Sequence, residues 1–299
     1  MEILPVKLCA QGSISLAGPP ASTGEATLTD LAVDLACMYR LCDEWGYNEG
    51  DSSNFTIAVK TDDGSMLFFL IKHGVQWQDV TVRDIILVNA AGDVVHDWGC
   101  GSNEACPSSA HFDVIGFHIR RAIHERLGAN GSVVLHTHMP TATTMSVMRT
   151  ENGGLVFPIH QASCRFHDNV VYDEKFSGLA CGPEEGYAEG NRVADVLTGG
   201  GATSRVRAVF LRNHGPMIVG RNVWEALDDL YYLHRACLFQ AEALKTAGGD
   251  MSRLAPLKDD IALATSRQSD HVRSLKGWKH ISSHRTRLLK AIPSIADVC

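Results

Sequence analysis

The 299-residue chain lacks several features that mark large functional classes. No apolar run approaches the roughly 18 residues that a membrane-spanning helix needs, so we expect no membrane segment. Basic residues are not in excess, since 27 Lys and Arg stand against 34 Asp and Glu for a formal net charge of -7. This mixed, acidic balance argues against a nucleic-acid-binding protein. The first residues show no basic stretch followed by a long apolar run, and hence no secretory signal.

Paired-cysteine and phosphate-loop motifs are absent as well. The nine cysteines are odd in number and scattered, with no CxxC pair, which indicates reduced, mostly buried thiols in a cytoplasmic protein. Neither GxGxxG nor GxxxxGKS/T occurs, so the sequence gives no support for nucleotide binding by a phosphate loop. No repeat of roughly 20–50 residues is present.

Composition and periodicity divide the chain into three parts. Residues 1–24 are rich in Gly, Pro, Ala and Ser and are expected to form a flexible arm. Residues 25–248 mix helical and strand-like patterns and predict one domain. Residues 249–299 are predicted to be a helical, more basic and peripheral C-terminal extension.

Apolar spacing predicts the elements of the central part. An amphipathic helix comes first, two hairpins follow, and later strands are separated by helices. This order lacks the strict alternation of a doubly wound parallel fold and predicts an α/β domain with a mostly antiparallel or mixed sheet. The expected helices are 27–45, 114–126, 184–197 and 222–246, with a short one after Pro140; the expected strands lie within 54–74, 84–98, 133–137, 154–159 and 205–220.

Two histidines end the predicted strand at 133–137. His136 and His138 are two residues apart, and side chains at i and i+2 of an extended strand point to the same face. Neutral imidazole is a good ligand for zinc, iron and similar ions. One buried and one exposed structural histidine would give the same spacing, so the pair alone leaves both interpretations open.

A third histidine stands in the segment LRNHGPMIVG. Gly215 permits a tight backbone turn after His214, so this imidazole can approach from a neighbouring strand. Three protein nitrogens with an open position are typical of a catalytic metal site rather than a closed structural one. A plain turn would also explain the Asn-His-Gly sequence.

Taken together, the motifs resemble the class II aldolase/adducin family. HTH after an apolar strand and RNHG further along occur in the order of that family. The likeness covers residues 27–245. It implies a single three-layer domain with a central, mostly antiparallel sheet flanked by helices, and a homotetramer with active sites at the subunit boundaries. The flanking segments that agree are SSNFTIAV, FLIKHGVQW, ILVNAAGDVV, SGLACGPEEG and VGRNVWEAL.

The resemblance also implies a set of site residues. A divalent metal would be held by His136, His138 and His214, with Zn2+ expected and Fe2+ as the alternative. Five further positions match family motifs near the substrate. These substrate-binding candidates are Asn54, Gly74, Ser108, Ser109 and Gln161. The two serines fit a helix-capping loop equally well.

The catalytic glutamate of the family has no direct counterpart. The phosphate aldolases have Pro-Ser-Ser-Glu, whereas Ala110 follows the serines here; aligned backward from HTH, the position falls near Gly116. Asp113 is the candidate replacement, because a carboxylate near a metal in a partly dry pocket can carry protons. A helix N-cap is an equally good interpretation of Asp113. Arg120 and Arg121, further along the same helix, are expected on its solvated face.

Three functions follow from these observations. The leading hypothesis is a metal-dependent lyase of the class II aldolase type. It would form or cleave a C–C bond through a metal-bound enolate or enediolate of a small oxo or hydroxy acid, since His73-Gly74 replaces the Thr-Gly of the family's phosphate loop. The alternative is a non-haem iron(II) oxygenase, because three histidines with open positions also suit iron and dioxygen. Relatives acting as decarboxylases also exist. The third hypothesis is a non-catalytic assembly domain like the adducin head, which loses the metal histidines that this chain retains.

Overall fold

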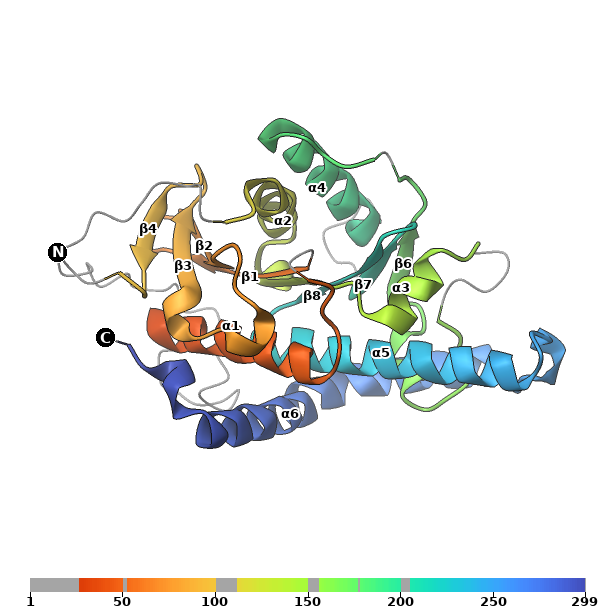
Figure 1. Cartoon of the computed structure of the whole chain (residues 1–299). Helices are drawn as coiled ribbons and strands as arrows, with labels where there is room; N and C mark the ends of the chain where they lie inside the picture. Colours follow the sequence, from red (N-terminus) through yellow and green to blue (C-terminus); the bar gives the residue numbers. More distant parts are fainter. Residues whose placement is uncertain are drawn as a thin grey trace.

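A computed structural model describes residues 27–50, 53–100, 112–149, 156–176, 178–199 and 205–298. Within these residues, eight strands form one sheet in the order β4-β3-β2-β1-β5-β8-β7-β6 (Figure 1). Neighbouring strands are antiparallel except for β6 and β7. The strands are β1 (Asn54–Lys60), β2 (Met66–Ile71), β3 (Ile85–Asn89), β4 (Val94–Asp97), β5 (Val133–His136), β6 (Val170–Asp173), β7 (Ala208–Leu211) and β8 (Gly215–Gly220).

Helices cover both faces of the sheet, and this arrangement gives three layers (Figure 1). One face carries α2 (Val114–Leu127) and α4 (Pro183–Thr198). The other face carries α1 (Leu28–Glu44) and α5 (Val223–Thr246), with α6 (Asp259–Ala291) packed outside them. The short α3 (Pro140–Ser146) contacts β8 and α5. The predicted α/β fold with a mostly antiparallel central sheet is therefore confirmed.

Alternation along the central strands explains why the sheet is apolar on both faces. In β5, Val133 and Leu135 belong to the core shared with α1 and α5, whereas Val134 belongs to the core under α2 and α4. Successive side chains of a strand point to opposite faces, so a strand covered on both sides reads as a continuous apolar run. This is why the residues before His136 are all apolar.

The first helix begins where the sequence places a reciprocal cap. Thr27 accepts a hydrogen bond from the Asp30 backbone, and the Asp30 side chain accepts one from the Thr27 backbone. Such caps are worth roughly 1 kcal/mol. Tyr39 is fully buried on the inner face of α1, and its hydroxyl accepts a hydrogen bond from the Phe55 backbone N–H at 2.9 Å. The helix is thereby fixed against β1.

One expectation for the chain after α3 was wrong, and one strand in this part of the chain was not predicted. Residues 156–159, the described part of the predicted strand 154–159, are not a strand. Pro158 has no N–H to donate, and the Phe157 N–H donates instead to the Gln240 side chain of α5. The strand that does form, β6, follows this segment and pairs in parallel with β7. It has four residues and was not among the strands expected from the sequence.

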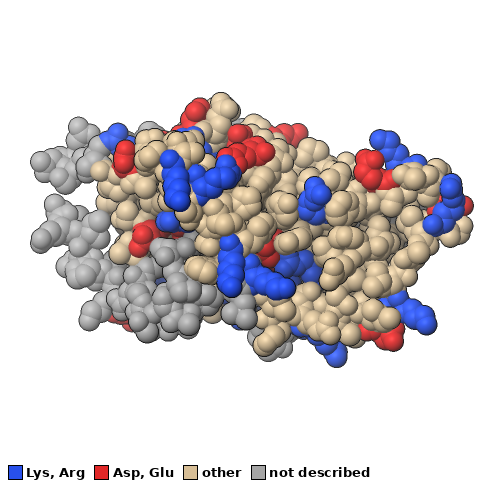
Figure 2. All heavy atoms as spheres, turned by 90° about the horizontal axis from the view of Figure 1, so that it is seen from below, with Lys and Arg blue, Asp and Glu red and all other residues tan. Residues whose placement is uncertain are grey.

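The C-terminal helix α6 is an outer layer but is not detached from the core. Ile281 and Leu288 are almost fully buried and belong to the same core as α1 and α5. Arg285 forms an ion pair with buried Asp34 of α1 at 2.7 Å. Viewed from the side of α6, acidic and basic side chains are interspersed over the described surface (Figure 2). No described helix combines the length and apolar composition of a membrane span.

One buried histidine joins α2 to the sheet. His124 is completely buried, and its ring contacts the Thr56 hydroxyl at 2.7 Å on one side and the Gly131 carbonyl on the other. Burial lowers the pKa of His124 to about 3, so the folded protein holds this ring neutral. The unfolded chain binds a proton near the ordinary value of about 6.5.

This difference predicts that stability falls as the pH is lowered below about 6.5, because only the unfolded state then gains the proton. We expect His124→Gln, which keeps groups for both hydrogen bonds, to reduce the pH dependence of the unfolding free energy. The reduction between pH 6 and 4 should reach about 1.4 kcal/mol per pH unit at most. Urea denaturation at several pH values measures it, with the exposed His160→Gln as control. An unchanged slope would show that His124 does not carry this dependence.

Candidate metal centre

Three histidines meet at the ends of two central strands of the sheet, where β5 ends and β8 begins. His136 is the last residue of β5, and His138 follows in the connection to α3. His214 lies in the tight turn between β7 and β8. Because β5 and β8 are paired, with His136 opposite Met217, the turn carrying His214 comes to the end of β5. The pairing of two strands far apart in sequence thus assembles the cluster.

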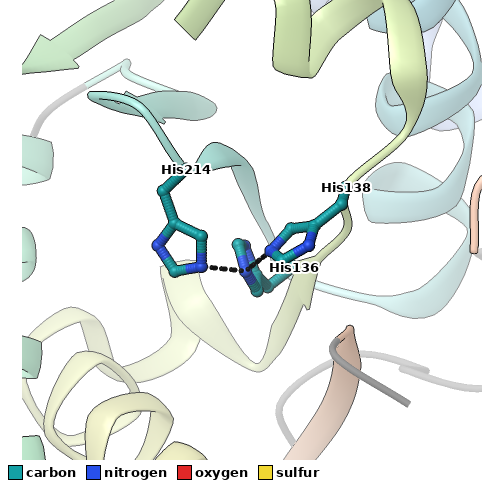
Figure 3. Close-up of side chains that lie close together, drawn as sticks. All are labelled: His136, His138 and His214. Carbon is teal, nitrogen blue, oxygen red and sulfur yellow. Dashed lines mark hydrogen bonds between the residues drawn. The ribbon is translucent and has the colours of Figure 1, made fainter. Parts of the chain in front are cut away.

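The ring nitrogens of the three histidines point toward one another (Figure 3). His136 Nε2 lies 3.1 Å from His138 Nε2 and 3.3 Å from His214 Nε2. One ligand atom from each residue lies within 4.8 Å of the other two. Within the described residues, this is the group of His, Cys, Asp and Glu side chains with the geometry to hold a metal ion.

The opposite nitrogens of two rings are occupied by acceptors. His136 Nδ1 lies 3.1 Å from the Pro216 carbonyl oxygen, and His138 Nδ1 contacts the carboxylate of Glu49. An acceptor at Nδ1 holds the proton there and leaves the Nε2 lone pair free for a cation. The backbone N–H of His138 also donates to the Ser53 hydroxyl at 3.0 Å. Both rings are therefore oriented before any ion binds.

The turn at His214 depends on the residues at either side of it. Asn213 adopts a positive φ of 55°, a conformation that asparagine tolerates better than most residues. At Gly215, a Cβ would lie 2.8 Å from the Thr137 carbonyl oxygen and 3.2 Å from the His138 ring. A larger residue at Gly215 would therefore push apart the two segments that carry the histidines.

Burial keeps two rings of the cluster, those of His136 and His214, in the neutral form that binds metals. The pKa of His136 is well below its ordinary value because the ring is buried, and the rings of His214 and His138 add to the effect. Burial, followed by the neighbouring His138, lowers the pKa of His214 to about 4. Both imidazoles thus keep a free lone pair at neutral pH.

The donor set and its spacing fit a divalent transition metal. Nitrogens bound to a tetrahedral Zn2+ at about 2.0–2.1 Å are about 3.3 Å apart, close to the observed separations. Three ligands would leave one coordination position for another molecule, as in catalytic zinc sites. The absence of sulfur ligands suits zinc and iron alike.

The predicted substrate residues fall into three groups. Asn54 and Gly74 line a narrow cavity of about 20 Å³ together with Asp113, and Asn54 is paired with His136 across β1 and β5. Gln161 is exposed in the turn before η6 (Ser163–Phe166), on a segment bonded to α5. The predicted phosphate-pocket residues Ser108 and Ser109 lie outside the described residues.

Asp113 adopts the N-cap geometry and also faces the cavity. Its Oδ1 accepts a hydrogen bond from the Gly116 N–H at 2.9 Å, and its Oδ2 accepts one from Asn54 Nδ2 at 3.0 Å. A Cβ at Gly116 would lie only 1.9 Å from Asp113 Oδ2. Arg120, expected on the solvated face of α2, is instead buried with Nη2 3.8 Å from the same carboxylate. Arg120 is buried because its face of α2 packs toward β1. The weakly amphipathic pattern of α2 did not indicate that this face would be buried.

Glu49 is the site residue that the sequence did not reveal. It lies in the connection from α1 to β1, far from the histidines in sequence, and its side chain is 68% exposed. No motif surrounds it, so only the folded structure brings it to His138.

Comparison with known proteins agrees with this architecture. In fold, the chain is similar to an aldolase II superfamily protein from Pseudomonas syringae, with a TM-score of 0.74, 20% identity, and coverage of 92% of this chain and 98% of that one. It is similar in fold to an L-fuculose 1-phosphate aldolase from Glaciozyma antarctica PI12, with a TM-score of 0.70, 21% identity, and coverage of 92% and 95%. These structures define the class as the class II aldolase fold.

The sequence places the chain in a family. The Class II Aldolase and Adducin N-terminal domain matches residues 33–241, so the chain belongs to this family. It is 27% identical to mouse alpha-adducin over 224 residues, and 29% identical to human beta-adducin over 217 residues. These alignments cover 73% and 72% of this chain but 26% of either adducin. The chain thus spans about a quarter of the length of the adducins it matches.

The contact between Glu49 and His138 predicts a metal affinity that depends on this carboxylate. We expect Glu49→Gln to weaken Zn2+ binding by about 10-fold while keeping one ion per chain, because loss of a carboxylate behind a ligand typically costs 10–100-fold. Replacing a ligand itself, as in His136→Ala, should remove most of the bound metal. Competition with a chromophoric chelator measures both, and the matched control is Glu184→Gln in the first turn of α4. Equal affinity of the wild type and Glu49→Gln would contradict a role for Glu49.

Proposed function

We propose that the chain is a divalent-metal-dependent lyase of the class II aldolase type. It would form or cleave a C–C bond beside the carbonyl group of a small oxo or hydroxy acid, by way of the enolate. The observation that carries this proposal is the convergence of the Nε2 atoms of His136, His138 and His214 within 4.8 Å. We further propose Zn2+ as the ion, with Fe2+ as the alternative. A bound divalent cation would supply Lewis-acid stabilisation of negative charge on substrate oxygen.

The residues beside the histidines suit recognition of a small polar substrate. The cavity next to Asn54 is narrow, and its wall includes His73 and Gly74 where the phosphate aldolases have Thr-Gly. Lys72 in the same wall is engaged by Asp97, with Nζ 2.6 Å from Oδ1. Because Asp97 neutralises this lysine, the wall offers less positive charge to a phosphate group, and we propose an oxo acid rather than a sugar phosphate as the substrate.

Asp113 is our candidate for the group that moves the proton. A side chain at position 116, where the backward alignment puts the family glutamate, would start 1.9 Å from Asp113 Oδ2. The Asp113 carboxylate therefore occupies the space that a side chain from that position would enter. Asn54 donates to Asp113 and is itself the neighbour of His136 in the sheet. Buried Arg120 lies beside the same carboxylate, with Nη2 3.8 Å from Oδ2.

A non-catalytic assembly role is the second candidate function. The sequence identity of 27–29% to alpha- and beta-adducin favours this role, because we expect the adducin head to be a non-catalytic assembly domain. The histidine cluster weighs against it, since an assembly domain has no need of three converging imidazoles. A homotetramer is compatible with both functions.

Proton exchange distinguishes the two functions. We expect the metal-loaded protein to exchange the methyl protons of pyruvate with deuterium from solvent, because enolate formation removes one of them. Proton NMR follows the signal loss. Chelator-treated protein and His136→Ala should be inactive, and the control His118→Ala, on α2, should remain active. If neither pyruvate nor a panel of other 2-oxo acids exchanged protons with solvent, the result would contradict the lyase. Metal-dependent oxygen uptake with the same acids would instead support the iron oxygenase.

The same assay tests the proton carrier. Asp113→Asn keeps the shape of the side chain and the ability to cap α2, so the fold should persist. Exchange should fall about 100-fold or more at unchanged metal content, because general-base catalysis typically contributes 10²–10⁴-fold. Exchange at the wild-type rate would rule Asp113 out as the carrier and leave the metal-dependent lyase intact.

A further inference from the structure

A second polar cavity lies at the other end of β8. It has a volume of about 500 Å³ and is lined by the residues at the start of β7, the end of β8 and the first half of α6. Its wall includes Gly220, the last residue of β8, whereas His214 precedes Gly215 at the opposite end of the same strand. A six-residue strand spans roughly 17 Å, so this cavity is separate from the histidine cluster.

Positive charge is in excess in this cavity. Asp270 is the one carboxylate among its described lining residues, and Glu225 and Asp229 lie directly behind the wall. Three carboxylates thus face five guanidinium groups, and His271 adds a titratable ring at the exposed rim. The lining arginines are Arg205, Arg207, Arg221, Arg267 and Arg273. This excess contrasts with the net charge of -7 for the whole chain.

The deepest arginine is incompletely satisfied. Arg207 is 3% exposed and forms ion pairs with Asp270 and, at 3.5 Å, with Asp229. Neither Nη1 nor Nη2 of Arg207 makes a hydrogen bond of good geometry with a described residue. Burial lowers the pKa of Arg207 to about 10; Asp229 and Glu225 oppose this shift, whereas the neighbouring Arg273 and Arg165 add to it. An additional anion would relieve this shortage of negative charge.

We propose that this arginine-lined cavity binds a compact oligophosphate. The planar guanidinium group forms paired hydrogen bonds with phosphate oxygens, and several arginines around one cavity match several phosphate groups. The described lining residues include no Phe, Tyr or Trp on which a nucleobase would stack. We therefore expect the cavity to recognise a chain of phosphate groups, either free or as the tail of a nucleotide. This site does not depend on the function proposed for the histidine cluster.

The bound anion would bridge separate parts of the fold. Arg267 and Arg273 belong to α6, whereas Arg207 and Arg221 flank β7 and β8. Arg205 already reaches Asp270 of α6. An oligophosphate contacting both sets would hold α6 more firmly on the sheet, and binding to the folded state alone raises the thermal midpoint.

The test is direct binding to the full chain. Isothermal titration with inorganic tripolyphosphate should give one site per chain, and affinity should fall as salt increases. ATP should bind comparably if only the phosphate chain is recognised, and more tightly if a nucleotide is the occupant. Citrate, an anion without phosphate, should bind at least 10-fold more weakly. No binding, or equally tight binding of citrate, would overturn the proposal.

Two variants connect the binding to the cavity. Arg205→Gln combined with Arg267→Gln changes arginines at the accessible edge and should weaken tripolyphosphate binding at least 10-fold. The matched control Arg126→Gln removes an exposed arginine that pairs with Asp195 elsewhere on the surface, and should bind as the wild type does. His136→Ala should also bind normally, which excludes phosphate binding at the histidine cluster. Loss of binding in His136→Ala, or wild-type affinity in the double variant, would contradict the assignment.

Discussion

The pairing of β5 with β8 is the constraint on which the histidine cluster depends. It sets His136 opposite Met217 and brings the β7–β8 turn, with His214, to the end of β5. A slip of one residue in this register would turn every side chain of β5 to the other face of the sheet. The core holds the register, because Val133 and Leu135 are buried on one face and Val134 on the other. Asn213 and Gly215 then give the turn the shape that lets the third ring approach.

The sequence predicted what local patterns encode. Helical periodicity gave α1, α2, α4 and α5, and the spacing of His136 and His138 indicated a shared direction. Family motifs, rather than periodicity, suggested that His214 joins them. Contacts between segments without a motif were not predictable: Glu49 reaches His138 from an exposed connection, and Arg120 is buried because α2 turns toward β1.

The end of the chain illustrates the same limit. Residues 249–299 read as helical and basic, and α6 is indeed helical, yet the residues it contacts could not be deduced from its own sequence. Ion pairs such as Arg285 with Asp34 connect positions about 250 residues apart in the chain. The five arginines of the second cavity also come from separate segments and look like ordinary solvated charges in the sequence. Tertiary packing alone brings these five arginines together around one cavity.

The histidine cluster and the arginine-lined cavity lie at opposite ends of β8 and differ in chemistry. At the start of β8, three converging imidazoles, two of them with lowered pKa values, offer nitrogen lone pairs to a cation. At its end, guanidinium groups that outnumber the nearby carboxylates attract an anion. The family contains both aldolases and adducins, so the fold alone decides neither role. The two proposed sites therefore depend on their own side chains, since metal binding and phosphate binding require different donors.

We propose that three imidazoles hold one cation and leave one coordination position open. X-ray absorption spectroscopy of the zinc-loaded protein examines this directly, because the fine structure detects imidazole rings and sulfur ligands around the ion. The spectrum should show three imidazole nitrogens at about 2.0–2.1 Å and one further oxygen ligand. A spectrum with sulfur ligands, or with fewer than three imidazoles, would contradict the assignment of His136, His138 and His214.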